Sequence, residues 1–218
     1  MIGLKMEKMN KLKIIEDYLD EIYPNPKCEL NYTKDYELLI AVVLSAQATD
    51  KSVNLVTPIL FSKYPTLLDL KNANLNDIIS IIRPIGTYNR KALYVKEIAK
   101  ILVDKYNGKV PKERQCLEAM PGVGRKVANV VLSEWFKEPS IAVDTHVERV
   151  SKRLKMAKEE DSVNTVEVKL QKLIKKEYWS KRHLQLVLFG RYMCKSIKPL
   201  CDDCKLKDIC GNKKRSFN

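Results

Sequence analysis

One stretch of the chain decides its fold: LEAMPGVGRKVANVV, residues 117–131. A Pro-Gly-x-Gly turn joins two segments of helical pattern, about 113–120 and 124–135. We expect Gly122 and Gly124 to adopt backbone angles closed to other residues and to let an anion approach closely. The free N–H groups at the start of the second helix would point at that anion. Four consecutive residues are therefore candidates for gripping a phosphate: Gly122, Val123, Gly124 and Arg125.

The residues around this turn exclude two other kinds of glycine-rich phosphate-binding motif. A dinucleotide fingerprint needs a third glycine at position 127, which is Val127, and a strand before the turn. A Walker loop needs Gly-Lys-Ser/Thr, but Arg125 precedes Lys126 here. The remaining interpretations are a helix-hairpin-helix motif over about 113–131 and a plain turn between helices.

Helical periodicity also dominates the rest of the chain. No segment alternates with the period of a strand, so we predict an all-α fold. A capping box at Thr145-x-x-Glu148 would start one helix. The other expected helices cover residues 14–22, 35–45, 52–61, 74–82, 89–106, 162–178 and 181–194.

The composition restricts the class of protein. A formal net charge of +13 on 218 residues favours a polyanionic partner, although a general lysine bias would give the same figure. The longest apolar run, residues 38–44, is too short to span a bilayer. We find no signal-peptide pattern and expect an intracellular protein.

Four cysteines crowd the C-terminal region with the spacing C-x6-C-x2-C-x5-C: Cys194, Cys201, Cys204 and Cys210. A disulfide framework does not suit a reduced intracellular chain. The compact spacing favours a [4Fe–4S] cluster held by four thiolates, and structural zinc is the alternative. Cys28 and Cys116 stand apart, and we interpret them as ordinary buried thiols.

Lys126 and Asp144 form a candidate catalytic pair. Lys126 would lie near the positive end of a helix and beside Arg125, and both influences disfavour its protonated form, as would burial. A neutral amine can attack an electrophilic carbon and form a Schiff base. The alternatives are a phosphate-binding lysine and, for Asp144, a helix cap.

These motifs together resemble the endonuclease III family of DNA glycosylases with lyase activity. The resemblance covers about residues 30–210. It depends on LLIAVVLSAQATD at 38–50, MPGVGRK at 120–126, VDTH at 143–146 and the cysteine spacing.

The resemblance implies a two-lobed helical fold. A helical barrel over 28–138 would carry the hairpin. A second lobe, from 1–27 and 139–218, would carry a [4Fe–4S] cluster on the loop 194–210, with Cys194, Cys201, Cys204 and Cys210 as ligands. Double-stranded DNA with damaged pyrimidines or abasic sites would lie across the cleft between the lobes.

The resemblance also implies roles for single residues. Lys126 would attack the sugar and displace the base, Asp144 would assist, and β-elimination would then nick the strand. Gln47 would fill the gap left by the flipped base. Thr87 stands where relatives often carry leucine as a wedge, so the preference for the opposite base is open. His146 is expected to be structural, and no role is assigned to Glu118.

Two rival functions are weaker on the sequence. One is an abasic-site lyase of the same fold with altered base specificity, and the other is a non-catalytic DNA-binding iron–sulfur module. The presence of both Lys126 and Asp144 argues against the second. We further expect a monomer in the cytoplasm, associated with the nucleoid through DNA, without a membrane partner.

Overall fold

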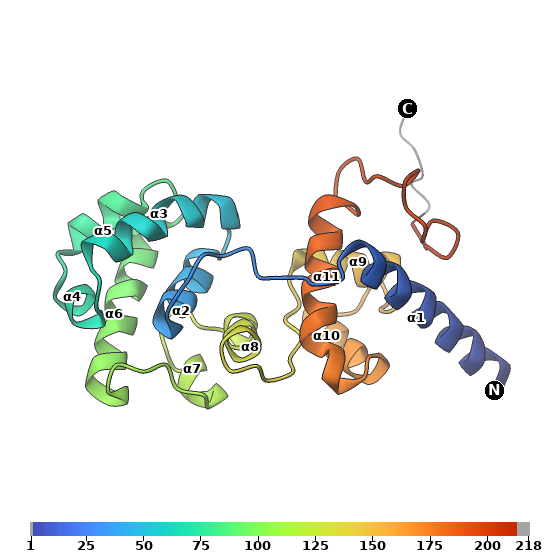
Figure 1. The fold of residues 1–218 in the computed structure, drawn as a ribbon, viewed down its shortest axis with the longest axis horizontal. Helices are drawn as coiled ribbons and strands as arrows, with labels where there is room; N and C mark the ends of the chain where they lie inside the picture. The colour runs from blue at the N-terminus through green and yellow to red at the C-terminus, as the bar shows by residue number, and fades with distance from the viewer. Residues whose placement is uncertain (1, 213–218) are drawn as a thin grey trace. The chain divides into compact units, whose positions relative to one another are not determined.

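The structure is a computed structural model that describes residues 2–212 (Figure 1). Contacts between Cα atoms divide the chain into unit 1, Met1–Cys28 with Glu138–Asn218, and unit 2, Glu29–Lys137. The boundaries expected from the sequence, 28–138, differ from this division by one residue at each end and stay a prediction. All regular elements among the described residues are helices, as predicted.

Unit 2 is built around a helix that has almost no contact with solvent. This helix is α2, Asp35–Leu44, and every residue from Leu38 to Leu44 is at most 2% exposed. Its nearly continuous apolar sequence has no polar face, as expected of a central helix. The other helices of the unit pack around this core: α3 (Asp50–Lys63), α4 (Leu67–Asn72), α5 (Leu75–Ile82), α6 (Tyr88–Tyr106), α7 (Arg114–Glu118) and α8 (Arg125–Glu134).

Unit 1 joins the start of the chain to its last third. Its helices are α1 (Ile2–Ile22), α9 (Thr145–Arg153), α10 (Val163–Leu173) and α11 (Trp179–Tyr192), with a 3-10 turn at Lys176–Tyr178. The core includes Leu19 of α1, Val150 of α9 and Phe189 of α11. The cysteine loop follows α11 and packs against this core through Leu206, which is fully buried.

The predicted helices agree with the observed ones to within a few residues at most ends, with three exceptions. The helix expected at 14–22 begins at Ile2, twelve residues earlier. The expected helix 162–178 ends as an α-helix at Leu173, and the 3-10 turn follows. Helix α4 was not predicted. It has only six residues, but its capping box is complete, with Thr66 and Asp69 each bonding to the other's backbone N–H.

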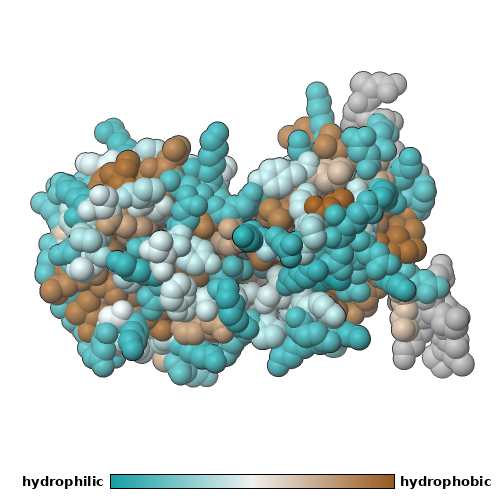
Figure 2. All heavy atoms as spheres, viewed as in Figure 1, coloured by the Kyte–Doolittle hydropathy of each residue, from teal (hydrophilic) through white to brown (hydrophobic). Residues whose placement is uncertain are grey.

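Two surface properties bear on partners. Within residues 2–212, no helix combines the length and the hydrophobicity that crossing a membrane requires. Figure 2 shows mostly hydrophilic side chains on the visible face, with a hydrophobic patch where α3 reaches the surface. That helix exposes Leu55 and Ile59, one turn apart.

Candidate nucleic-acid interface and active site

The Pro-Gly-x-Gly turn forms a tight hairpin between α7 and α8. Gly122 has φ +77°, which favours glycine, and a Cβ at this position would lie 2.5 Å from Cδ2 of Tyr94 on α6. Gly124 has φ −97° and ψ −178°, extended angles that any residue adopts. The expectation of special angles at both glycines was therefore wrong for Gly124. A Cβ on Gly124 would meet nothing within 4 Å, so its lack of a side chain leaves open space before α8.

The first turn of α8 carries the candidate nucleophile. Gly124 is the N-cap, and it has no side chain to satisfy the free N–H groups that follow. Arg125 and Lys126 are both exposed, while the next residue, Val127, is buried. Burial therefore does not act on the Lys126 amine, contrary to that part of our expectation.

Two loops of unit 2 bring the predicted DNA contacts Gln47 and Thr87 close to one another. An ideal Cβ on Gly86, the residue before Thr87, would lie 3.8 Å from the carbonyl oxygen of Gln47. Gln47 has φ 55° and Thr87 has φ 57°, both in the left-handed region. A threonine with this φ is rare, because its branched Cβ makes the conformation costly. Such strain is typical of functional loops, and both side chains are exposed.

Helix α6 connects these loops to the hairpin. It begins at Tyr88, directly after Thr87, and its Tyr94 ring lies under Gly122. Unit 2 therefore places four predicted features on one connected framework: Gln47, Thr87, the hairpin and Lys126.

Asp144 caps helix α9 in unit 1. Its Oδ1 accepts hydrogen bonds from the backbone N–H groups of His146 (2.9 Å) and Val147 (2.8 Å). The predicted capping box at Thr145 and Glu148 would make Thr145 the N-cap. The observed N-cap is Asp144, one residue earlier, so that prediction was wrong. The aspartate alternative is the observed cap, because its carboxylate reaches two free N–H groups at once. Glu148 instead forms an ion pair with Lys152 at 2.6 Å.

His146 and Arg149 connect the start of α9 to α11. Arg149 Nη2 donates to the carbonyl oxygen of Gly190 at 2.7 Å and lies 3.2 Å from Nδ1 of His146. A Cβ on Gly190 would come within 2.8 Å of the His146 Cβ, so the two helices pack very closely there. Burial lowers the pKa of His146. The close packing of this imidazole is consistent with the structural role we expected.

The four clustered cysteines line a single pocket in unit 1, together with apolar side chains such as Leu154, Phe189 and Leu206. Burial raises the pKa of the Cys201 and Cys204 thiols, and the charges of neighbouring thiols raise it further. Arg153 donates Nη1 to the Cys194 sulfur at 3.3 Å, and its carbonyl oxygen lies 3.4 Å from the Cys210 sulfur. If all four were ionised, they would repel one another, so a cationic partner would favour the thiolate forms.

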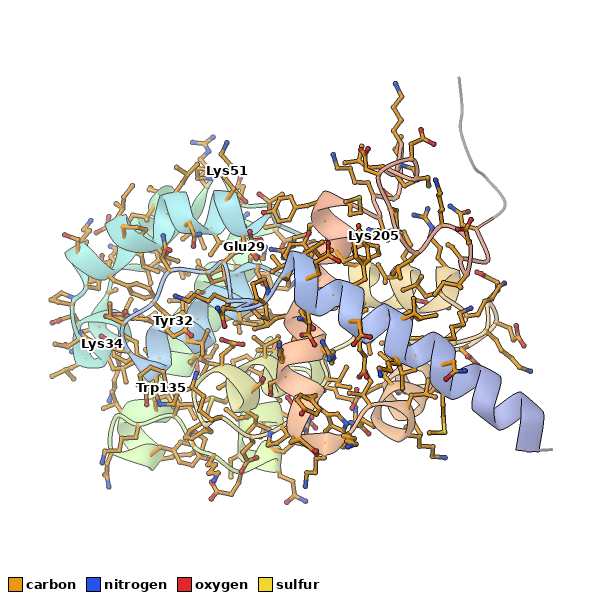
Figure 3. The ribbon with its side chains drawn as sticks, turned by 45° about the vertical axis from the view of Figure 1, so that its right-hand side comes forward. Glu29, Tyr32, Lys34, Lys51, Trp135 and Lys205 are labelled. Carbon is orange, nitrogen blue, oxygen red and sulfur yellow. The ribbon has the colours of Figure 1, made fainter. Side chains whose placement is uncertain are left out.

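Two further expectations differ from the structure. Cys28 and Cys116, expected to be buried, are partly exposed. The sequence also gave no sign that Tyr32 and Trp135 would meet, with ring centroids 6.4 Å apart (Figure 3). The Tyr32 hydroxyl lies 3.5 Å from Glu134, whose pKa is raised by burial. These contacts join the two ends of unit 2, and no periodicity or motif reports a contact across a hundred residues.

Comparison with known proteins places this geometry in a family. Residues 40–176 match the family model of the HhH-GPD superfamily base excision DNA repair protein. Endonuclease III of Bacillus subtilis is 46% identical over 205 residues, which are 93% of this chain and 94% of the relative. Endonuclease III of Escherichia coli K12 is 44% identical over 209 residues, 95% of this chain and 99% of the relative.

Solved structures agree with the sequence matches. A trapped endonuclease III–DNA covalent intermediate superimposes with a TM-score of 0.90 at 48% identity, over 93% of this chain and 95% of that one. A thermostable thymine-DNA glycosylase shares the fold, with a TM-score of 0.82 at 24% identity, over 93% and 96% of the two chains.

The all-helical fold and the helix-hairpin-helix define a DNA base excision repair enzyme of the glycosylase/lyase class. Within that class, the chain belongs to the endonuclease III family. The fold class, the family and the DNA partner predicted from the sequence are thereby confirmed.

Proposed function

We propose that this protein removes damaged pyrimidines from double-stranded DNA and then nicks the abasic strand, using Lys126 for both steps. The observation that carries the proposal is an exposed lysine in the first turn of α8, next to a hairpin with open space before its helix. A relative of the same fold forms a covalent intermediate with DNA. A surface amine at a helix N-terminus provides a nucleophile for such a bond.

The hairpin would hold the DNA backbone for this reaction. The N–H groups that follow Gly124 bind a phosphate without reading the base, so they fix the register of the strand. The damaged nucleotide is rotated out of the duplex, which costs a few kcal/mol and less for a poorly stacked base. Gln47 and Thr87, held on adjacent strained loops, would occupy the gap and support the opposite strand.

The chemical steps follow from the amine. The Lys126 nitrogen attacks C1′ of the sugar while the C1′–N bond to the base breaks, and the base leaves with that electron pair and takes up a proton. The sugar ring opens to an iminium, which acidifies the C2′ hydrogens. Loss of a C2′ proton expels the 3′ phosphate oxygen with its electron pair, so the strand breaks on the 3′ side. Asp144, the N-cap of α9, would stabilise positive charge on the sugar as the base departs.

We further propose a [4Fe–4S] cluster on Cys194, Cys201, Cys204 and Cys210. The family is known for such a cluster, and the four thiols here surround a pocket. The compact spacing of these four cysteines supports a cluster over a single zinc. When bound, the cluster would tie the loop to the core of unit 1. The bonds change on the sugar alone, and the cluster takes no part in them.

Borohydride reduction tests the covalent step, because it converts the iminium to a stable amine. We predict that the wild-type protein is trapped on an abasic duplex and that Lys126→Ala abolishes the adduct while DNA binding persists. Lys152→Ala is a matched control, since that lysine is already paired with Glu148. A wild-type protein that forms no adduct would refute the lyase activity. An equal loss of binding and trapping in Lys126→Ala would make this lysine a phosphate contact instead.

A panel of duplexes separates the proposed function from an abasic-site lyase. Each duplex carries one damaged pyrimidine, and base release and nicking are scored separately. The proposal expects release and nicking on damaged pyrimidines. Nicking of abasic DNA without any base release would favour the lyase alternative.

A further inference from the structure

A forked arginine joins the two helices of the hairpin. Arg114 is the first residue of α7. Its Nη2 donates to Oδ1 of Asn129 on α8 at 2.5 Å, and its Nη1 lies 3.3 Å from Oε1 of Glu118 at the end of α7. One planar guanidinium therefore binds both sides of the turn. We call Glu118, Arg114 and Asn129 the hairpin bridge.

The position of Asn129 makes this bridge relevant to the reaction. Asn129 is 1% exposed and lies on the apolar side of α8, next to the fully buried Ala128. A polar side chain in such a place requires a hydrogen-bond partner. Asn129 also comes three residues after Lys126, so the two are neighbours along the helix surface. An anchor at Asn129 therefore limits how the first turn of α8 can shift or rotate.

The two contacts of Arg114 differ in burial. The difference indicates that the bridge aligns the two helices more than it stabilises the folded protein. The side chains of Arg114 and Glu118 are 35% and 36% exposed, and an ion pair of that kind contributes little to folding. The contact of Arg114 with Asn129 is short and charge-assisted, with its acceptor buried. Glu118 contacts Nη1 of the same guanidinium whose Nη2 donates to Asn129.

We propose that Arg114 is a positioning residue for Lys126, acting through Asn129, and that Glu118 orients Arg114. This inference depends on the proposed function, because it assigns the bridge to the nucleophile of that reaction. Displacing a reacting group by about 1 Å can cost about 100-fold in rate. A weakened bridge should therefore slow the chemistry before it affects DNA binding or folding.

The test measures single-turnover nicking of an abasic duplex, non-covalent DNA affinity and the urea unfolding midpoint for the cluster-containing protein. We expect Arg114→Lys, which keeps the charge but lacks the fork, to lower the nicking rate about 10-fold with less than a 2-fold change in affinity. Asn129→Leu should have a similar effect. Asn129→Asp should restore a nearly wild-type rate, since its carboxylate still accepts from Arg114.

A double variant and a control complete the test. Arg114→Lys combined with Asn129→Leu should be no slower than either change alone, because both break one contact. Lys71→Gln, which removes the ion pair of Lys71 with Asp104 elsewhere in unit 2, should leave the rate unchanged.

Three results would overturn the bridge. The first is a variant with a lower unfolding midpoint but an unchanged nicking rate. The second is a variant whose DNA affinity and nicking rate fall together. The third is an Asn129→Asp protein that is as slow as Asn129→Leu. If Asn129→Leu does not fold, the rates of Arg114→Lys and Asn129→Asp still test the positioning role of the bridge. Failure of the proposed function looks different, because the wild-type protein itself then gives no covalent adduct.

Discussion

At the scale of single residues, Asp144 combines a structural and a chemical role that substitution can separate. Its Oδ1 accepts hydrogen bonds from His146 and Val147 at the start of α9. An asparagine has the same oxygen in the same place and is an equally good N-cap, but it carries no charge. The proposed contribution to catalysis requires that charge.

We therefore predict different outcomes for two variants of Asp144. Asp144→Asn should slow base release by about 100-fold or more, with the free energy of unfolding nearly unchanged. Asp144→Ala should slow release equally and also lose about 1 kcal/mol of stability. Single-turnover base release and urea unfolding measure the two effects. Ser162→Ala, which removes the cap of α10, should lower stability alone. Normal base release in Asp144→Asn would leave this residue as only a cap.

The residue scale also shows what the sequence could and could not predict. The glycines, Lys126 and Asp144 were predicted as site residues because their spacing is a motif, and their roles stay a prediction. The reason for Gly124 was wrong, since backbone angles follow from the whole turn and not from residue type. The left-handed angles of Gln47 and Thr87 were not predicted. A threonine gives no local signal for such a conformation, which the surrounding loops impose.

At the scale of elements, the two glycines of the hairpin differ in whether a side chain fits at their positions. Gly122→Ala places a methyl group at φ +77° and 2.5 Å from the Tyr94 ring, so we expect it to destabilise the protein by about 1–3 kcal/mol. Gly124→Ala meets neither obstacle and should change stability by less than about 0.5 kcal/mol. Its methyl group would instead fill the space before α8.

DNA binding should therefore respond to Gly124→Ala although folding does not. We expect about a 10-fold loss of affinity for an abasic duplex, measured by fluorescence anisotropy, if a phosphate approaches the backbone there. Unchanged affinity in a stable Gly124→Ala protein would contradict phosphate binding at this hairpin.

A second element-scale prediction concerns the contact of α1 with α11. Asp20 accepts from Nη1 and Nη2 of Arg182, at 2.7 and 2.9 Å, and it also pairs with Lys181. The Arg182 hydrogen bonds hold the pKa of Asp20 well below its usual range. The folded state therefore keeps this carboxylate ionised at a pH where the unfolded chain, with a pKa of about 3.9, already binds a proton.

The sign of the effect follows from that difference. The contribution of Asp20 is complete above about pH 5 and is lost as the pH falls through the folded pKa. The free energy of unfolding should drop more between pH 6 and pH 3 in the wild-type protein than in Asp20→Asn. Asp17→Asn, on the exposed side of the same helix, should follow the wild type. Parallel pH profiles of wild type and Asp20→Asn would contradict the linkage.

Helices were predicted better than their connections. The apolar run of α2 and the stop after α6 are local signals, and both agree with the structure. The six-residue α4 has too few residues for a periodic pattern. The hairpin bridge and the Tyr32–Trp135 contact depend on tertiary packing, which no spacing in one sequence reports.

At the scale of the whole molecule, a net charge of +13 favours binding to the phosphates of DNA. Each phosphate neutralised by a lysine or arginine releases a counterion, so affinity falls linearly on logarithmic axes with a slope of about −0.9 per contact. We predict a steep salt dependence for binding to any duplex, damaged or not.

Arg125→Ala should reduce the slope by about one unit for all sequences, as expected of a phosphate contact. Lys158→Ala, which changes an exposed lysine paired with Glu160 in unit 1, should leave it unchanged. Titrations of fluorescent duplexes from 50 to 200 mM salt measure the slope, and a flat response would show that phosphates do not supply the binding free energy.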